Sequence, residues 1–221
     1  MKIRLGLRLL GSVAMATLGL LAVSGVAQAQ PSEDAGYFTN GLSPLSASAT
    51  YVVPSFTCTG KQGDAIVVNV NWTALSTDMG FASVTIDCAG AGARPTFAST
   101  VYAGGTDFVA GPSIKPGDTI TVSISGSSTG SSSKLTDVTT GKTAKVRGMS
   151  QTAKGINARF VLERELDTTP SFTKLTFQAM TVDGAPLTSS TANAAHMMSS
   201  VVQAHARPIS SANGVIVFKH S

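Results

Sequence analysis

Charged side chains are scarce in this chain and make up only 13% of its 221 residues. The formal net charge is +4, and there is no basic patch with interleaved aromatic residues, so a nucleic-acid partner is not expected. Glu, Lys and Leu, which favour helices, are outnumbered by Ser, Thr, Gly, Val and Ala. The composition is therefore typical of strands and turns.

Cysteine and histidine are also rare, with two and three residues respectively. No His lies near Cys58 or Cys88 in the sequence, so we predict neither a metal site nor a cofactor. In an oxidising compartment, a lone pair of cysteines favours a disulfide between Cys58 and Cys88. Two buried free thiols are the alternative.

Only one long apolar run occurs, and it lies near the N-terminus. Three cations precede the run at 9–26, and Ala27-Gln28-Ala29 follows as a small-residue cleavage site. Residues 1–29 are therefore predicted to be a Sec-type signal peptide of a secreted or periplasmic protein; a retained membrane anchor is the alternative. Cleavage would lower the formal net charge from +4 to +1. No second span of about 20 apolar residues follows, so we expect no membrane association after cleavage.

The remaining part of the chain is long enough for one domain. Residues 30–50 are rich in Ser, Gly, Pro and Ala, and we interpret them as a flexible lead-in. Residues 51–221 are predicted to form the folded domain. Within it, a Ser/Gly-rich stretch at 126–133 indicates a loop, and 191–205 is the one region that suits a short helix.

Alternating apolar and polar residues predict most of the strands. Ile66, Val68, Val70 and Trp72 share one face of a segment that starts at Ala65. Further strands are predicted at 82–88, 96–102, 119–125, 135–139, 142–147, 158–165, 172–180 and 215–219. Many short strands with turns every 8–12 residues predict an all-β sandwich or barrel.

Several segments together resemble a known family. Asn157-Ala158-Arg159-Phe160-Val161-Leu162-Glu163-Arg164 is similar to the Asn-Ala-Glu-Trp/Phe-Ile-Val-Glu-Arg motif of the glutamic peptidases (eqolisins, peptidase family G1, formerly A4). The strand after Pro116-Gly117-Asp118, the hairpin at 135–142 and the segments at 53–58 and 175–179 resemble other family segments, in the family's order. The resemblance runs from about 52 to 218.

This resemblance implies both a fold and an activity. The fold is an antiparallel β-sandwich of two sheets, like the concanavalin A fold. The activity is an acid endopeptidase, in which a Glu activates a water and a Gln orients the water and donates to the oxyanion. Glu163 matches the catalytic Glu. Trp72 also falls in a matching segment and is the candidate substrate-binding residue. It is expected to lie either in the core or in the wall of the groove. The implied partner is a polypeptide substrate or ligand in a groove, and we expect a monomer.

The family's Gln has no counterpart here. Counting forward from Trp72 by the family's spacing leads to Ile86, with Thr85 and Asp87 as the nearest polar residues. A carboxylate pair of Glu163 and Asp87 is one alternative. The family's groove segment is also altered, because 97–102 lacks its Trp and Glu. Three functions remain open: a glutamic-type endopeptidase with degraded activity, an inactive sandwich that binds a polysaccharide or peptide, and a structural surface protein.

Overall fold

A computed structural model describes residues 34–39, 46–60, 64–74, 77–127, 129–149, 157–164, 169–188, 195–198, 204–206 and 216–220. The chain divides into two units, 1–30 and 31–221, and the second contains every described residue. Among these residues the secondary structure is entirely β, with seventeen strands and no helix. No described helix is therefore long and apolar enough to cross a membrane.

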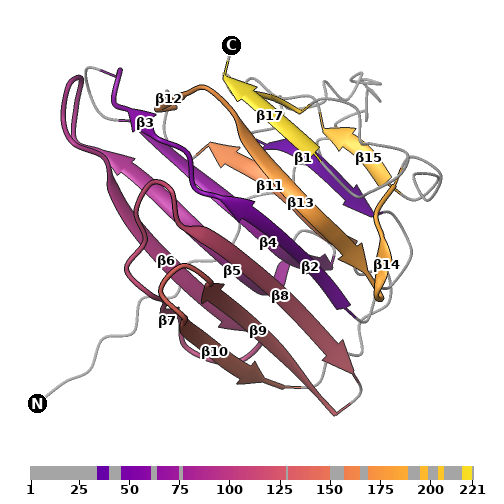
Figure 1. Cartoon of the computed structure of the whole chain (residues 1–221). Helices are drawn as coiled ribbons and strands as arrows, with labels where there is room; N and C mark the ends of the chain where they lie inside the picture. Colours follow the sequence, from indigo (N-terminus) through magenta and orange to yellow (C-terminus); the bar gives the residue numbers. More distant parts are fainter. Residues whose placement is uncertain are drawn as a thin grey trace, which may run out of the picture. The chain divides into compact units, whose positions relative to one another are not determined.

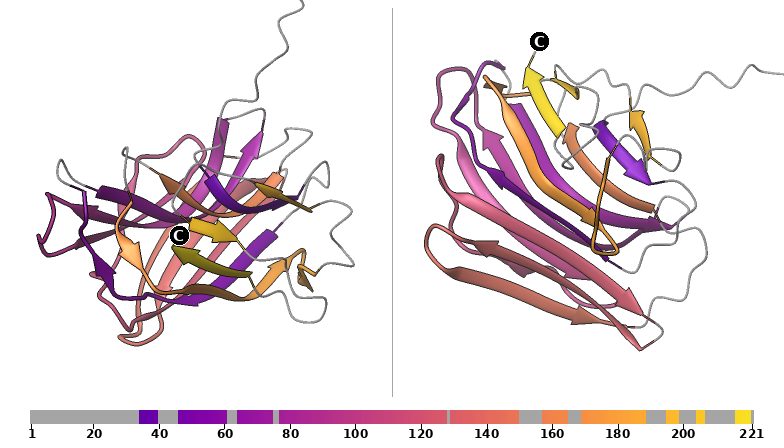
Figure 2. Two further views of the ribbon diagram at one scale, coloured as in Figure 1. Left: turned by 90° about the horizontal axis from the view of Figure 1, so that it is seen from above. Right: turned by 45° about the vertical axis from the view of Figure 1, so that its right-hand side comes forward.

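The strands form two large antiparallel sheets and a small one (Figures 1 and 2). The seven-stranded sheet has, in spatial order, β15 (Ala195–Met198), β1 (Asp34–Thr39), β11 (Asn157–Arg164), β4 (Asp64–Ala74), β5 (Thr77–Cys88), β6 (Thr96–Ala103) and β7 (Val109–Ala110). The eight-stranded sheet has β10 (Lys142–Gly148), β9 (Gly130–Asp137), β8 (Thr119–Ser127), β2 (Ser46–Val52), β13 (Leu175–Val182), β17 (Ile216–His220) and β16 (Ala204–Ala206), with β14 (Ala185–Pro186) paired to β13. The small sheet pairs β3 (Phe56–Thr57) with β12 (Ser171–Phe172).

The hydrophobic core lies between the two large sheets, which stack as a sandwich (Figure 2). Successive side chains of a strand point to opposite faces, so every second residue faces the core. The face of β4 that was predicted to be apolar is buried there, as are Ile120, Val122 and Ile124 of β8. The all-β antiparallel sandwich is therefore confirmed.

The predicted flexible lead-in at 30–50 needs correction, because it supplies a strand to each large sheet. β1 pairs with β11 and β15, and β2 pairs with β8 and β13. Ala47, Ala49 and Tyr51 of β2 are buried in the core. These residues alternate with Ser and Thr along β2, but alanine is only weakly apolar, so the alternation does not predict a strand clearly.

Two further predictions of local structure were wrong. The predicted loop at 126–133 is the end of the β8–β9 hairpin, where Gly126 pairs with Ser131. β9 buries serines beside its one large apolar residue, Leu135, so the hydrophobic alternation is hidden. The predicted helix at 191–205 contains β15 and the first residues of β16, which pair with β1 and β17. β1 lies far from β15 in the sequence, so this pairing leaves no local signal.

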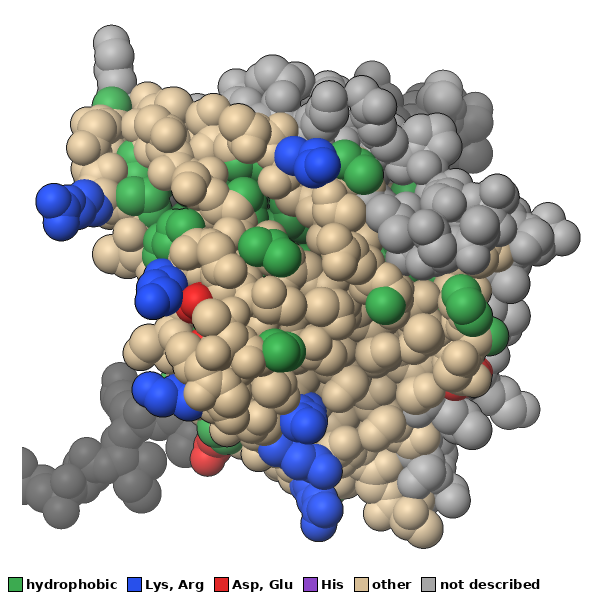
Figure 3. Space-filling model, in the orientation of Figure 1, with side chains coloured by type: hydrophobic (Ala, Val, Ile, Leu, Met, Phe, Trp, Pro, Cys, Tyr) green, Lys and Arg blue, Asp and Glu red, His purple; other side chains and the backbone are tan. Residues whose placement is uncertain are grey.

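Figure 3 shows mostly tan atoms on the outer face of the eight-stranded sheet, with scattered hydrophobic and charged side chains. Cross-strand side-chain hydrogen bonds join Thr50 to Thr121 at 3.0 Å and Ser48 to Thr181 at 2.7 Å. Such pairs each contribute roughly 0.2–1 kcal/mol. This face therefore remains polar with few charges, as the composition of the chain requires.

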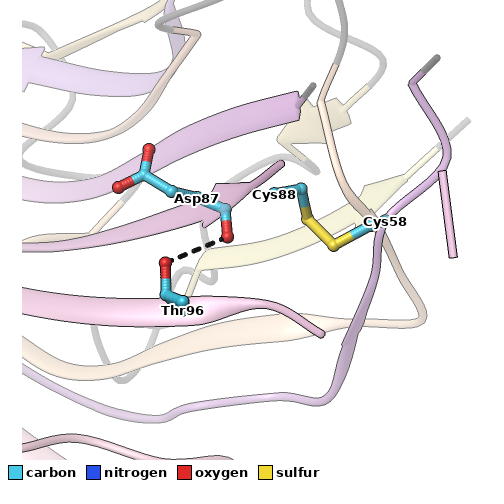
Figure 4. The surroundings of a disulfide bond; sticks show 4 residues. All are labelled: Cys58, Asp87, Cys88 and Thr96. Atoms are coloured by element: carbon cyan, nitrogen blue, oxygen red, sulfur yellow. Dashed lines mark hydrogen bonds between the residues drawn. A yellow bond between two sulfur atoms is a disulfide. The ribbon is translucent and has the colours of Figure 1, made fainter. Parts of the chain in front are cut away.

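The predicted disulfide between Cys58 and Cys88 is confirmed, with the two Cα atoms 5.5 Å apart. Cys58 directly follows β3, and Cys88 is the last residue of β5. Figure 4 shows the neighbouring Asp87 side chain pointing away from the sulfur atoms, while Thr96 Oγ1 donates to the Asp87 carbonyl oxygen at 3.3 Å. The bond therefore ties the small sheet to one end of the seven-stranded sheet.

Removing this bond is expected to destabilise the fold. The cysteines are 30 residues apart, so the double substitution Cys58→Ala and Cys88→Ala should lower the free energy of unfolding by about 3–4 kcal/mol through the larger entropy of the unfolded chain. Urea unfolding followed by the fluorescence of Trp72, the only tryptophan, measures the change. A reducing agent should have the same effect on the original protein and none on the variant; equal stability of both proteins would contradict the prediction.

A glycine of β8 allows the close approach of Trp72 across the core. A Cβ atom at Gly126 would overlap the indole ring. Gly126→Ala should therefore destabilise the protein by about 1–3 kcal/mol, because the ring is 1% exposed and has little room to move. Gly130→Ala is the matched control in β9, where the nearest atom to the new Cβ is 3.4 Å away. Equal melting temperatures for the two variants would refute the argument.

Candidate active site

Glu163 lies on the outer face of the seven-stranded sheet, the face that points away from the sandwich core. In β11, Phe160 and Leu162 point into the core, so Arg159, Val161 and Glu163 point the other way. The Glu163 side chain is 20% exposed. The strand predicted at 158–165 is thus confirmed as β11.

Three nitrogen-bearing side chains surround one oxygen of this carboxylate. Asn69 Nδ2 donates to Glu163 Oε1 at 3.1 Å, and Asn71 Nδ2 donates to the same atom at 3.4 Å. Arg159 Nη1 lies 3.8 Å from Oε1 and completes an ion pair. Amide and guanidinium N–H groups only donate, so they match the ionised form of the carboxylate. The arrangement therefore holds Glu163 as an oriented, charged side chain.

The position of the two asparagines follows from the pairing of β4 with β11. Val67 is the register partner of Glu163, Asn69 of Val161, and Asn71 of Arg159. The asparagines therefore share the outer face with Glu163, while the intervening residues of β4 face the core. The sequence reasoning missed both asparagines. The alternation of β4 could have identified them, because Asn69 and Asn71 are the polar residues between its apolar positions.

Glu163 borders a pocket of about 230 Å³. Four neighbouring strands of the seven-stranded sheet, β11, β4, β5 and β6, supply its walls. The lining residues are Val67, Asn69, Phe81, Ser83, Thr85, Thr100 and Glu163. The serine and threonines bring hydroxyl groups, which both donate and accept hydrogen bonds. The pocket therefore combines one carboxylate, one amide and several hydroxyls with a single aromatic ring.

Counting by the family's spacing led to Ile86, but the structure does not place this residue at the pocket. Ile86 is fully buried in the core, on the opposite face of β5 from the pocket. Thr85 lines the pocket and pairs with Val67, which itself pairs with Glu163, so the three residues form one row across the sheet. A shift of one residue reverses the face of a strand. The residue that faces the carboxylate from β5 is thus a threonine.

The alternative of a carboxylate pair is not supported by the register. Asp87 is two residues beyond Thr85 on β5, and Thr85 is two strands away from Glu163. Standard strand spacings separate the Cα atoms of Asp87 and Glu163 by about 12 Å. Asp87 does not line the pocket. This distance is too long for the two carboxyl groups to share a proton.

The candidate substrate-binding residue, Trp72, lies in the core. It is 1% exposed and points to the opposite side of β4 from Asn69 and Asn71. A side chain with so little exposure offers no surface to a ligand on the outer face. The prediction that Trp72 contacts a substrate is therefore corrected, and its role as a core residue stands.

Asn69 also carries a buried acceptor without a partner. The residue is 4% exposed, and its Oδ1 makes no hydrogen bond while its Nδ2 donates to Glu163. A buried acceptor left unpaired costs about 1–3 kcal/mol. Such a cost is typical of a functional site, where a side chain is kept for its chemistry rather than for stability.

Stacked antiparallel sheets, with a glutamate held in a pocket on an outer face, define a glutamic-peptidase type of β-sandwich. A model described as the peptidase A4 family matches residues 29–217. The chain therefore belongs to the peptidase A4 family, the glutamic peptidases, as the motifs around Glu163 predicted.

Solved structures support the same fold. Scytalido-glutamic peptidase, solved with a peptide-based transition state analog, is 18% identical with a TM-score of 0.65 and covers 86% of this chain and 98% of its own. SCP-B, a member of the eqolisin family in complex with the tripeptide Ala-Ile-His, is 18% identical with a TM-score of 0.62 and the same coverages. Aspergilloglutamic peptidase from Aspergillus niger is 16% identical, with a TM-score of 0.50, over 71% of this chain and 99% of its own. No curated protein sequence matches significantly.

The unpaired acceptor of Asn69 leads to a testable effect on stability. Asn69→Leu keeps most of the side-chain volume but removes both the unpaired oxygen and the amide that donates to Glu163. The gain from the first change and the loss from the second are each about 1–3 kcal/mol, so the free energy of unfolding should change little. Asn69→Ala removes the same oxygen but leaves a cavity, and should be less stable than the Leu variant. Urea unfolding of the three proteins measures this order. A Leu variant less stable than the Ala variant would contradict it.

Proposed function

We propose that this protein is an exported endopeptidase of the glutamic type, which hydrolyses peptide bonds at acid pH with Glu163 as the general base. The observation that carries the proposal is the placement of Glu163: it is held by the amides of Asn69 and Asn71 at the edge of a pocket lined with hydroxyl groups. General bases need such a fixed orientation toward the proton that they remove.

In the proposed reaction, Glu163 takes a proton from a water molecule as the water oxygen attacks the carbonyl carbon of the peptide bond. The carbonyl electron pair moves to its oxygen, which becomes an oxyanion. The Thr85 hydroxyl, opposite Glu163, donates a hydrogen bond to this oxyanion, and Ser83 and Thr100 stand beside it. Protonated Glu163 then gives its proton to the leaving nitrogen, and the carbon–nitrogen bond breaks.

This scheme differs from the family's chemistry in the nature of the donor. An amide side chain offers two N–H donors and one acceptor, whereas Thr85 offers one hydroxyl. Loss of one oxyanion donor typically costs about 10²–10³ in rate. We therefore expect slow turnover, and no cofactor is needed for any step.

Export is part of the same proposal. The N-terminal pattern of cations, apolar run and small-residue site supports a signal peptide over residues 1–29. The Cys58–Cys88 disulfide suits an oxidising compartment, either the periplasm or the outside of the cell. The proposed chemistry takes a polypeptide as its substrate.

A second candidate function is an inactive sandwich that binds a polypeptide. The observation that favours it is the threonine at the position that faces Glu163, because a single hydroxyl is a weak substitute for an amide. In that case the pocket would hold its ligand without cleaving it.

Substitution of the base is the test of the proposed reaction. Glu163→Gln keeps the shape of the side chain and its acceptor oxygen for the asparagine amides, but removes the base. Cleavage of a denatured protein between about pH 2 and 5 should fall by about 10²–10⁴-fold. Product peptides counted by mass spectrometry give the rate.

Asp87→Asn is the matched control, because Asp87 is an exposed carboxylate of β5 that does not line the pocket. It should retain the activity of the original protein. Cleavage that survives Glu163→Gln would refute the role of Glu163. A lack of cleavage by the original protein, together with binding of the denatured substrate, would favour the inactive sandwich.

A further inference from the structure

Three aromatic rings form a cluster near the pocket, on the same sheet. The ring centroids of Phe81 and Tyr102 are 5.5 Å apart, those of Phe81 and Phe108 5.7 Å, and those of Tyr102 and Phe108 5.1 Å. Phe81 and Tyr102 are register partners on β5 and β6, and Phe108 follows in the loop before β7. We call these three residues the aromatic cluster.

The cluster exposes apolar surface. Phe108 is 69% exposed, although its ring contacts two others. Tyr102 and Phe81 are each partly exposed beside it. Contiguous exposed apolar groups of this kind mark binding sites in soluble proteins.

The cluster is continuous with the pocket of Glu163, because Phe81 belongs to both. The row of Phe81 also contains Asn71 and Arg159, which contact the Glu163 carboxylate. A ligand in the pocket can therefore also contact the aromatic cluster, since Phe81 is part of both.

We propose that the aromatic cluster is a specificity site that binds a large apolar side chain of the polypeptide substrate, at some distance from the bond that is cleaved. The inference rests on the proposed peptidase function insofar as the bound polypeptide is a substrate. The binding itself does not depend on cleavage. Phe81, Tyr102 and Phe108 would contact that side chain.

The sheet geometry sets the position of that side chain. Phe81 is four residues along β5 from Thr85, and Thr85 is two strands from Glu163. These steps separate the Cα atoms of Phe81 and Glu163 by about 16 Å. An extended peptide advances about 3.3–3.6 Å per residue. The side chains of Phe81 and Glu163 both reach into one pocket, which shortens the distance that the peptide must span. The apolar residue of the substrate should therefore lie about three to five residues from the cleaved bond.

The spacing of the three rings suits an aromatic partner. The rings are tilted to one another by 33°, 34° and 45°. Aromatic rings prefer offset or edge-to-face neighbours at 4.5–7 Å, so a fourth ring from a ligand can join the cluster with favourable geometry.

Peptide binding to the Glu163→Gln variant tests the inference without interference from cleavage. The probes are fluorescein-labelled Gly/Ser/Ala peptides of twelve residues, each with one Phe at a different position, and an all-Ala reference. Fluorescence anisotropy gives the Kd of each. Phe at one or two neighbouring positions should bind at least about tenfold more tightly than the reference, because its ring leaves water.

Substitutions in the cluster must then remove this preference. With Phe108→Ala added, the preferred peptide should bind like the reference, whereas Phe108→Leu should retain most of the preference. Val138→Ala, at an exposed apolar residue in the β9–β10 turn, is the control and should change nothing. Thermal unfolding of each variant excludes loss of folding as the cause.

The outcomes separate this inference from the proposed function. A series with no preferred position, or a preference that survives Phe108→Ala, would overturn the specificity site even if the original protein cleaves proteins. A preference that depends on Phe108 would support it even if no cleavage occurs. Binding of cellohexaose that depends on Phe108, with no preference among the peptides, would overturn it in favour of a sugar site.

Discussion

The two-sided character of β4 is the constraint on which the rest of the structure depends. One face of the strand packs Ile66, Val68, Val70 and Trp72 into the core. The other face carries Asn69 and Asn71, whose amides hold Glu163 on the neighbouring strand. Core packing fixes which face of β4 points outward, and pairing with β11 then fixes the distance from the amides to the carboxylate. Stability and the candidate site thus share one strand.

The site illustrates how a scaffold and its chemistry can change separately. The family's sandwich is present, and in it Glu163 shares a row of the sheet with Val67 and with a threonine, Thr85. The nearest amides now lie on β4 and bind the carboxylate itself. Fold alone therefore does not decide whether the chemistry continues. The decisive groups are the hydroxyls of the pocket and the orientation of Glu163.

Hydrogen bonds between uncharged side chains are more frequent than ion pairs in the described part of this molecule. Hydroxyl pairs join the strands of the eight-stranded sheet, and amides rather than lysines surround the catalytic candidate, with Arg159 as the exception.

The sequence by itself determined the strands that alternate clearly, above all β4 and β8, as well as the disulfide. The strands follow from local periodicity, and the disulfide follows from a lone pair of cysteines. The tertiary structure alone decided that Ile86 lies in the core while Thr85 lines the pocket, that Trp72 belongs to the core, that Glu163 points away from it, and that β1 and β15 are strands. One physical reason is that a strand repeats every two residues, so a counting error of one reverses its faces. The other is that β1 and β15 pair with each other although they lie near opposite ends of the described sequence, and no local pattern reveals such a partner.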